Sequence, residues 1–185
     1  MKTKPIFNFT PFPVLETERL LLRKPEKNDD YALFVLRSND EVNKLIPRVN
    51  YQSIEEAQNF LTRINNNIAE NDCIFWMMEL KETNQLIATI CLWNLSAENS
   101  IAEIGYEMHP DFHGKGYMQE AVAKVIDYGF SVMKVQTIFG VPFKENIKSI
   151  KLLERFNFKR DMAAEQIMHN NQTGKQVYLS LQNTH

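Results

Sequence analysis

Residues 102–121 read AEIGYEMHPDFHGKGYMQEA, a strand-like segment joined to a helix-like segment by a corner with two glycines. Apolar and polar residues alternate before the corner, and apolar residues after it fall on one helical face. The corner is either a plain turn or a cradle in which N–H groups at the helix start bind a phosphate. Gly114 and Gly116 would allow the close approach, since glycine has no Cβ. The local pattern does not decide between them, because it matches neither the GxxxxGKS/T loop nor the GxGxxG fingerprint.

The flanking sequence predicts an α+β (mixed α/β) fold. We expect strands over 18–24, 73–80, 85–93, 101–109, 136–143, 158–168 and 176–182, and helices over 28–39, 53–71, 117–133 and 147–156. Antiparallel strands come first and a βαβ unit follows, which indicates a mixed, mostly antiparallel sheet of about seven strands with about four helices. Residues 1–16 read as a proline-punctuated arm, and residues 17–185 as a single domain.

Composition narrows the class of protein. The 185 residues are 44% hydrophobic and 24% charged, as in an ordinary globular domain. A formal net charge of -2 argues against a dedicated nucleic-acid binder. Cys73 and Cys91 lie in apolar runs and read as reduced core thiols, and the histidines show no metal-ligand spacing. The start is a poor signal peptide and no apolar stretch approaches ~20 residues, so we expect a cytoplasmic location.

Three segments, in their order and spacing, resemble the GNAT acetyltransferase superfamily. They are residues 17–30 (TERLLLRKPEKNDD), the stretch 102–121 and residues 141–158 (VPFKENIKSIKLLERFNF). More specifically they resemble the RimJ/RimL-type branch, which acetylates protein N-termini, ribosomal proteins among them. The resemblance covers about residues 17–181. It implies the acyl-CoA N-acyltransferase fold, with acetyl-CoA as co-substrate and no metal.

The family's phosphate loop reads Gln or Arg, two residues, Gly, one residue, then Gly or Ala. By resemblance, the cofactor-binding residues of this loop are His113, Gly114, Lys115, Gly116, Tyr117 and Met118. Gly116 keeps the central glycine. His113 stands where Gln or Arg is usual, and Met118 stands where a small residue is usual. Loops of this type bind the diphosphate mainly through main-chain N–H groups.

The resemblance also implies that two parallel strands, 101–109 and 136–142, splay apart around the pantetheine arm. The backbone near Met108 would then bind the pantetheine amide and the thioester carbonyl. Asn146 matches the family's asparagine at the start of the following helix, where it contacts the cofactor. A plain helix cap is the other interpretation of Asn146, and the two are compatible.

Transfer of an acetyl group to an amine needs a group that takes the amine proton. Glu103 and Glu107 lie on one face of their strand, ~13 Å apart at ~3.3 Å per residue, so they cannot share one proton. We prefer Glu103 as the catalytic base, because it lies in the AEIGY segment that resembles the family. The alternatives are a glutamate that only bonds neighbouring backbone, or a water chain as the base.

The leaving thiolate benefits from a proton donor. The superfamily's usual tyrosine is missing, because the matching position is Leu153. Ser149 is the nearest hydroxyl on the same helix and is our candidate for the catalytic acid, although it also reads as a first-turn helix residue. Tyr106 and Tyr117 are further candidates. The acceptor pocket should be built by the two early helices and the loop 46–52, with Arg48 and Tyr51 as candidate contacts.

We therefore expect an N-acetyltransferase that moves an acetyl group from acetyl-CoA to a primary amine by direct attack in a ternary complex. The acceptor is a protein N-terminus or a small-molecule amine. One alternative is a catalytically weak or inactive acyl-CoA-binding module, favoured by Met118 and the missing tyrosine. Another is a structural protein without cofactor, which Gly116 and Asn146 count against. Nucleic acid and membranes are not expected as partners, and a homodimer is left open.

Overall fold

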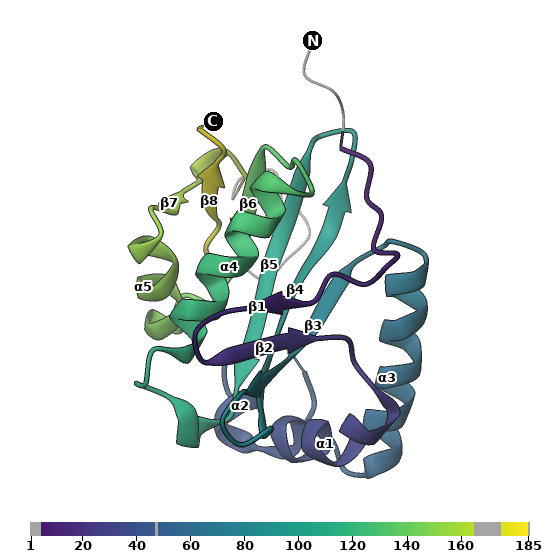
Figure 1. Ribbon diagram of the computed structural model, residues 1–185. Helices are drawn as coiled ribbons and strands as arrows, with labels where there is room; N and C mark the ends of the chain where they lie inside the picture. Colours follow the sequence, from purple (N-terminus) through teal and green to yellow (C-terminus); the bar gives the residue numbers. More distant parts are fainter. Residues whose placement is uncertain (1–4, 47, 165–174, 185) are drawn as a thin grey trace.

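The computed structural model describes residues 5–46, 48–164 and 175–184, and a twisted sheet forms its centre (Figure 1). Within these residues eight strands follow the order β1-β2-β3-β4-β5-β6-β8-β7. They are β1 Leu15–Glu16, β2 Leu20–Arg23, β3 Ile74–Leu80, β4 Leu86–Ser96, β5 Ile101–Met108, β6 Thr137–Gly140, β7 Lys159–Arg160 and β8 Leu179–Gln182. Neighbouring strands are antiparallel except β5 and β6, which are parallel. The predicted mixed, mostly antiparallel sheet is confirmed.

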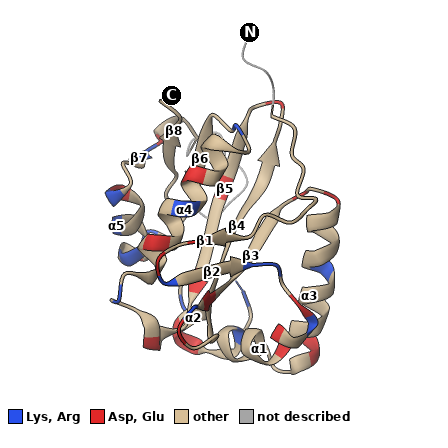
Figure 2. Ribbon diagram, viewed as in Figure 1, with Lys and Arg blue, Asp and Glu red and all other residues tan. Residues whose placement is uncertain are grey.

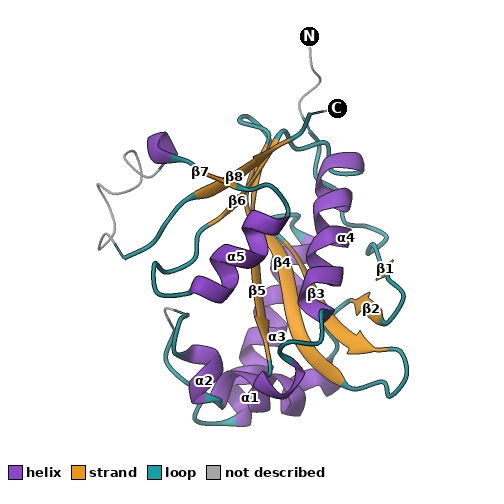
Figure 3. Ribbon diagram, turned by 90° about the vertical axis from the view of Figure 1, so that its left-hand side faces the viewer, coloured by secondary structure: helices purple, strands orange, loops and turns teal. Residues whose placement is uncertain are grey.

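Helices cover both faces of this sheet (Figure 3). They are α1 Asp30–Ser38, α2 Asp40–Asn43, α3 Ile54–Ala69, α4 Tyr117–Ser131 and α5 Ile147–Arg155, with short 3-10 turns η1 Lys27–Asp29 and η2 Pro110–Phe112. Phe75 and Trp76 are adjacent in β3 and so point to opposite faces. Phe60 of α3 packs on Phe75, and Tyr128 of α4 packs on Trp76, with ring centroids 5.4 and 5.5 Å apart. The sheet therefore separates α3 from α4.

Helix α5 shares the face of α4. Ile138 and Gly140 are two residues apart in β6, so they lie on the same face. A Cβ on Gly129 of α4 would lie 2.9 Å from Ile138, and a Cβ on Gly140 would lie 2.5 Å from Leu153 of α5. Glycine at these two positions lets both helices pack closely on the same end of the sheet.

Strands β5 and β6 separate after a short paired stretch. Residues 101–103 pair in register with residues 137–139, and β6 ends one residue later while β5 continues to Met108. On its other side β6 pairs with β8. The expected splay between the two parallel strands is thus present, and the second half of β5 lines it.

The structure departs from the sequence prediction at β1, α2 and β7. The arm 1–16 ends in strand β1, because Leu15 is buried and pairs with Leu22 of β2. The short helix α2 was not predicted; Asn39 caps it by accepting hydrogen bonds from the two N–H groups of Glu41 and Val42. In the closing hairpin β7 pairs with β8 as expected. The predicted strand 158–168 is wrong in length, since β7 has two residues and helical turns follow at 162–164; the turn 170–174 lies outside the described residues.

The cysteines, the helices and the potential metal ligands bear on the class of protein. Cys73 and Cys91 are both free, and burial raises the pKa of Cys73 to about 11. None of the helices in the described ranges combines the length and the apolar character that crossing a bilayer requires. Among the same residues, no three His, Cys, Asp or Glu side chains are grouped to hold a metal ion.

Candidate functional site

The corner between β5 and α4 is built on two left-handed glycines. Gly114 and Gly116 have φ angles of 76° and 81°. A residue with a Cβ adopts this conformation at a cost of roughly 1–2 kcal/mol. Gly116 is also the N-cap residue of α4, which begins at Tyr117. The backbone therefore needs both glycines of the quoted stretch, whatever ligand the corner binds.

The N–H groups that lead into α4 form the core of the candidate site. Within the described residues, the backbone N–H groups of residues 114–119 have no hydrogen-bond partner. Helix α4 has 15 residues, and the positive end of its dipole lies at the same place. Met118 is partly buried and packs against the hydrophobic core, so its long side chain is accommodated there. Unpaired N–H groups at a helix start fit a phosphate.

Two side chains of the loop 113–118 contact residues that precede it in the chain. Nε2 of His113 lies 3.2 Å from the carbonyl oxygen of Met108, which ties the loop to the end of β5. Nζ of Lys115 lies 5.2 Å from the ring centroid of Phe112. His113 and Met108, both predicted to meet the cofactor, are thus neighbours in the structure.

A hollow adjoins the glycine corner on the α4 side. It is lined by Arg19, Gly116, Gln119, Glu120, Ala123 and Phe156, the last of which follows α5. Helix α5 carries three basic residues, Lys148, Lys151 and Arg155, against one acidic residue, Glu154 (Figure 2). The positive charge of this helix favours an anionic ligand in the hollow.

Two hydroxyl groups meet at the splay. Oδ1 of Asn146 accepts a hydrogen bond of 3.1 Å from the N–H of Ser149 and so caps α5. Oγ of Ser149 lies 2.7 Å from Oη of Tyr106 on β5. Burial raises the pKa of Tyr106 to about 12, although the hydrogen bond with Ser149 acts in the opposite direction. Tyr106 therefore keeps its proton at neutral pH.

Glu107 is the anionic centre of a buried network. Its carboxylate forms ion pairs with Arg37 of α1, at 2.7 Å, and with Arg48, at 2.5 Å. Thr89 of β4 donates a further hydrogen bond of 3.1 Å. Burial acts to raise the pKa of Glu107, but the two guanidinium groups outweigh it and hold the pKa below its usual range. A carboxylate held in this way joins β5 to the loop that contains Arg48, and it is a poor proton acceptor.

Glu103 lies on the same strand in a different environment. Its carboxylate accepts one hydrogen bond, of 2.8 Å, from Nδ2 of Asn94. Burial raises the pKa of Glu103 to about 6, against the effect of that hydrogen bond. A carboxyl group with this pKa is ionised at pH 7 and is more basic than an ordinary glutamate.

The carboxylate of Glu103 and the hydroxyl of Tyr106 lie on opposite faces of β5. Tyr106 is paired across the sheet with Ile90, which in turn is paired with Trp76 on the α4 face. Glu103 is three residues before Tyr106 and so points to the α3 face. A thioester placed in the splay between β5 and β6 would have the glutamate on one side and the hydroxyl pair on the other.

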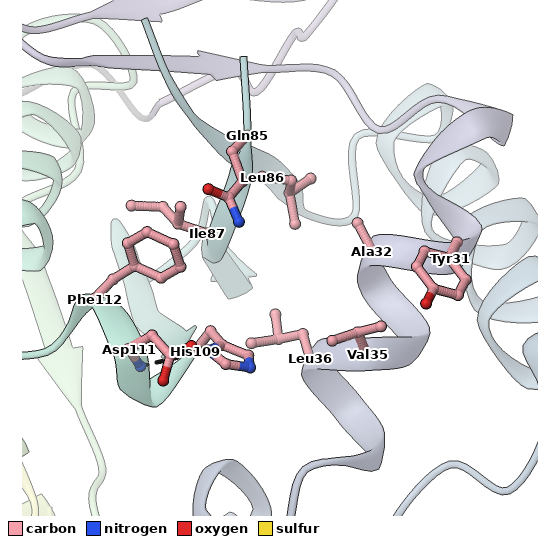
Figure 4. Close-up of a pocket in the computed structure, with 10 residues that line it drawn as sticks. All are labelled: Tyr31, Ala32, Val35, Leu36, Gln85, Leu86, Ile87, His109, Asp111 and Phe112. Carbon is pink, nitrogen blue, oxygen red and sulfur yellow. Dashed lines mark hydrogen bonds and ion pairs between the residues drawn. The ribbon is translucent and has the colours of Figure 1, made fainter. Parts of the chain in front are cut away.

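A separate apolar cavity of about 220 Å³ lies between α1 and η2 (Figure 4). Its lining residues are Tyr31, Ala32, Val35, Leu36, Gln85, Leu86, Ile87, His109, Asp111 and Phe112. Figure 4 shows His109 and Asp111 together at one side, where the N–H of Asp111 donates to Nδ1 of His109 at 3.4 Å. This cavity shares no lining residue with the hollow at Gly116. Four of its lining residues come from α1, one of the two helices predicted to build the acceptor pocket.

The structure thus brings most predicted site residues into two groups and leaves one apart. Residues 113–118 and Met108 form the corner, whereas Ser149 meets Tyr106 at the splay and Asn146 caps the helix that carries Ser149. Glu103 lies on the other face. Leu153, at the position of the missing tyrosine, is 1% exposed and packs on Gly140.

Arg19 is a residue near the corner that sequence reasoning missed. Its Nη1 donates a hydrogen bond of 3.0 Å to the carbonyl of Lys115, 96 positions away in the chain. The segment 17–30 was noted only as part of the family resemblance. No local pattern signals a contact over that separation.

Comparison with known proteins agrees with the family resemblance seen in the sequence. Residues 19–159 match the protein-family model described as an acetyltransferase (GNAT) domain. The uncharacterised N-acetyltransferase YoaA of Bacillus subtilis (strain 168) is 36% identical over 162 residues, which cover 88% of this chain and 92% of that protein.

Two solved structures share the fold at low sequence identity. The ribosomal-protein-S5-alanine acetyltransferase from Vibrio fischeri aligns with a TM-score of 0.75 at 19% identity, covering 93% of this chain and 97% of that one. The spermidine N-acetyltransferase from Vibrio cholerae, in complex with CoA and spermine, aligns with a TM-score of 0.73 at 19% identity, covering 90% and 96%.

Proposed function

The chain belongs to the GNAT acetyltransferase family and uses acetyl-CoA, and we propose that it acetylates a primary amine by direct attack in a ternary complex. The resemblance to this superfamily is confirmed, and so is the prediction of an acetyl-CoA-dependent enzyme. The proposal concerns which residues bind the two substrates and how the acetyl group passes between them.

The observation that carries the proposal is the set of unpaired N–H groups at residues 114–119, beside a splay that leads to two hydroxyl groups. In this proposal the N–H groups bind the diphosphate of acetyl-CoA, and His113, Lys115, Tyr117 and Met118 shape the loop. The pantetheine arm follows the unpaired half of β5 towards Met108. Asn146 contacts the cofactor from the start of α5.

We propose a role for each catalytic side chain from the face of β5 on which it lies. The amine approaches from the α3 face, where Glu103 takes its proton directly or through one water. The thiolate leaves on the α4 face, where the hydroxyl of Tyr106 donates a hydrogen bond to it and Ser149 orients that hydroxyl. The new amide bond forms as the thioester carbon–sulfur bond breaks, and a backbone N–H near Met108 stabilises the oxyanion.

Two observations support turnover over an inactive binding module. Met118 packs against the core, which in this proposal keeps its thioether out of the cradle. The tyrosine missing at Leu153 has a substitute in Tyr106, which reaches Ser149 from β5. Both features instead support turnover.

The acceptor is either a protein N-terminus or a small-molecule amine, and the loop 46–52 is the element that we propose contacts it. Arg48 of this loop is tied to Glu107, and Tyr51 accepts a hydrogen bond of 3.0 Å from Nη1 of Arg37. Arg48 directly, and Tyr51 through Arg37, are therefore tied to Glu107 of β5, close to the end of the strand at which we propose that the thioester binds.

The test begins with cofactor binding and continues with turnover. Thermal melting with acetyl-CoA at 100 times its dissociation constant should add ~2.7 kcal/mol of stability. Gly116→Val should abolish that gain, because valine is strained at φ 81° and its Cβ would lie 3.4 Å from Nη2 of Arg19, so the backbone at the cradle has to shift. Wild-type affinity in this variant would refute the cradle.

A panel of N-terminal peptides, polyamines, amino acids and aminoglycosides, assayed by thiol release, then identifies the acceptor. Binding of acetyl-CoA without thiol release with any of these amines would contradict the enzymatic proposal.

A further inference from the structure

The turn between β1 and β2 holds the cofactor corner through one arginine. Nε of Arg19 donates a hydrogen bond of 2.8 Å to Oε2 of Glu120 in the first turn of α4, and its Nη2 lies 2.8 Å from the same oxygen. Its Nη1 donates to the carbonyl of Lys115 at 3.0 Å. The guanidinium carbon lies 4.5 Å from the ring centroid of Tyr117. One side chain thus contacts three residues at the start of α4.

The contact with Lys115 has a directional consequence. In a trans peptide the C=O and N–H bonds point in opposite directions. Because Arg19 fixes the carbonyl of Lys115, it also fixes the N–H of Gly116 on the far side of the same peptide plane. Gly116, which follows this peptide bond, is left-handed and has no Cβ, so the peptide rotates easily on that side and an external hydrogen bond affects its orientation.

Glu120 holds the arginine in place. Its Oε1 accepts a hydrogen bond of 2.8 Å from the backbone N–H of Arg19 and another from the hydroxyl of Thr17. Burial acts to raise the pKa of Glu120, but the hydrogen bonds from Thr17 and Arg19 outweigh it and keep the pKa low. The ionised carboxylate orients the guanidinium, and the guanidinium cancels a negative charge that would otherwise repel a diphosphate at the helix start.

We propose that Arg19 is a positioning residue for the acetyl-CoA diphosphate: it aims the N–H of Gly116 into the cradle by bonding the Lys115 carbonyl. This inference rests on the proposed placement of the cofactor. It predicts an effect on the diphosphate end of the co-substrate and none on the chemistry at the thioester.

The experiment compares Arg19→Gln with Lys81→Gln. Lys81 is a matched control, since its Nζ pairs with Glu16 at 2.8 Å and donates to the carbonyl of Thr17 at 2.8 Å, in the same turn but away from the corner. By calorimetry, Arg19→Gln should raise the dissociation constant of CoA about tenfold, the equivalent of one charge-assisted hydrogen bond. Lys81→Gln should leave it within about twofold. Both variants should melt within about 3 °C of the wild type, because Arg19 and Lys81 are exposed.

A second readout excludes a merely structural role. With the amine found in the panel, kcat/KM for acetyl-CoA should fall about tenfold in Arg19→Gln. It should stay at the wild-type value for S-acetylpantetheine, which lacks the diphosphate. Equal losses with the two donors, or an unchanged CoA affinity, would overturn the role of Arg19. If Gly116→Val also keeps wild-type CoA affinity, the cradle itself is wrong; if only Arg19→Gln does, the cradle stands and this inference fails.

Discussion

Replacement of Glu103 by glutamine should raise stability and lower activity at the same time. Burial raises the pKa of Glu103 from its ordinary value of 4.5 to about 6, in spite of the hydrogen bond from Asn94. Glutamine keeps the size of the side chain and an oxygen that can accept this hydrogen bond. The substitution therefore removes the half-buried charge and little else.

The magnitude follows from the pKa. The difference between about 6 and 4.5 corresponds to about 2 kcal/mol, at ~1.36 kcal/mol for a pKa difference of one. Because the pKa of Glu103 is higher in the folded state, its favourable contribution is complete below pH ~4.5 and is lost as the pH rises through about 6. The wild type should therefore lose about 2 kcal/mol relative to Glu103→Gln between pH 4 and pH 8.

Urea denaturation of both proteins across this pH range measures the effect directly. The difference in the free energy of unfolding should grow with pH, and most of the change should fall between pH 4.5 and pH 6.5. A difference that stays constant with pH would refute the claim that partial burial raises the pKa of Glu103.

Turnover should change in the opposite direction. If Glu103 takes the amine proton, wild-type kcat should rise with pH through about 6, and Glu103→Gln should lose roughly 10²–10⁴-fold in rate. Wild-type turnover by the glutamine variant at pH 8 would refute the assignment of Glu103 and leave a water chain as the base.

Three further substitutions test neighbouring parts of the site. Glu107→Gln should cost about 3–5 kcal/mol in urea denaturation at pH 7, because it leaves Arg37 and Arg48 without their buried anion; a loss below about 1 kcal/mol would show that the network is not buried in solution. Tyr106→Phe should lower kcat about tenfold in steady-state assays with little change in the KM for acetyl-CoA, and an unchanged kcat would exclude the hydroxyl pair. Asn146→Ala should cost about 1 kcal/mol of stability through the lost helix cap and should weaken CoA binding by calorimetry; a stability loss without weaker binding would leave Asn146 as a cap only.

Local chemistry explains which features could be predicted from sequence. The capping box of Ser53 and Glu56 and the cap by Asn146 involve residues three apart, so the helix starts at 54 and 147 follow directly. The corner at Gly114 and Gly116 was predictable for the same reason, since positive φ is a property of single residues. The missed strand β1 has only two residues and depends on pairing with β2, which no local pattern reports.

Glu103 and Glu107 show why the candidate site was only partly predictable. They are the same residue type on the same face of the same strand. Their pKa values move in opposite directions because Arg37, 70 positions away, and Arg48, 59 positions away, meet Glu107 and not Glu103. Sequence reasoning chose Glu103 from its resemblance to a family segment. The physical reason for the choice lies in tertiary contacts that the sequence does not display.

Acidity limits what the hydroxyl pair of Tyr106 and Ser149 can do. A free thiol has a pKa near 8.5, whereas burial raises the pKa of Tyr106 to about 12. Full proton transfer from Tyr106 to the leaving thiolate would therefore run uphill, and serine is a still weaker acid. The pair is better suited to stabilise the thiolate by hydrogen bonds, with Ser149 orienting the tyrosine.

The amine proton then leaves through Glu103 on the opposite face, and the thiolate is released or protonated from solvent. It follows that kcat should rise with pH as Glu103 ionises near pH 6. It should then stay constant up to about pH 10, because no catalytic acid loses its proton in that range. A fall in kcat between pH 8 and pH 9 that disappears in Tyr106→Phe would show that the tyrosine does act as an acid, and this division of roles would be wrong.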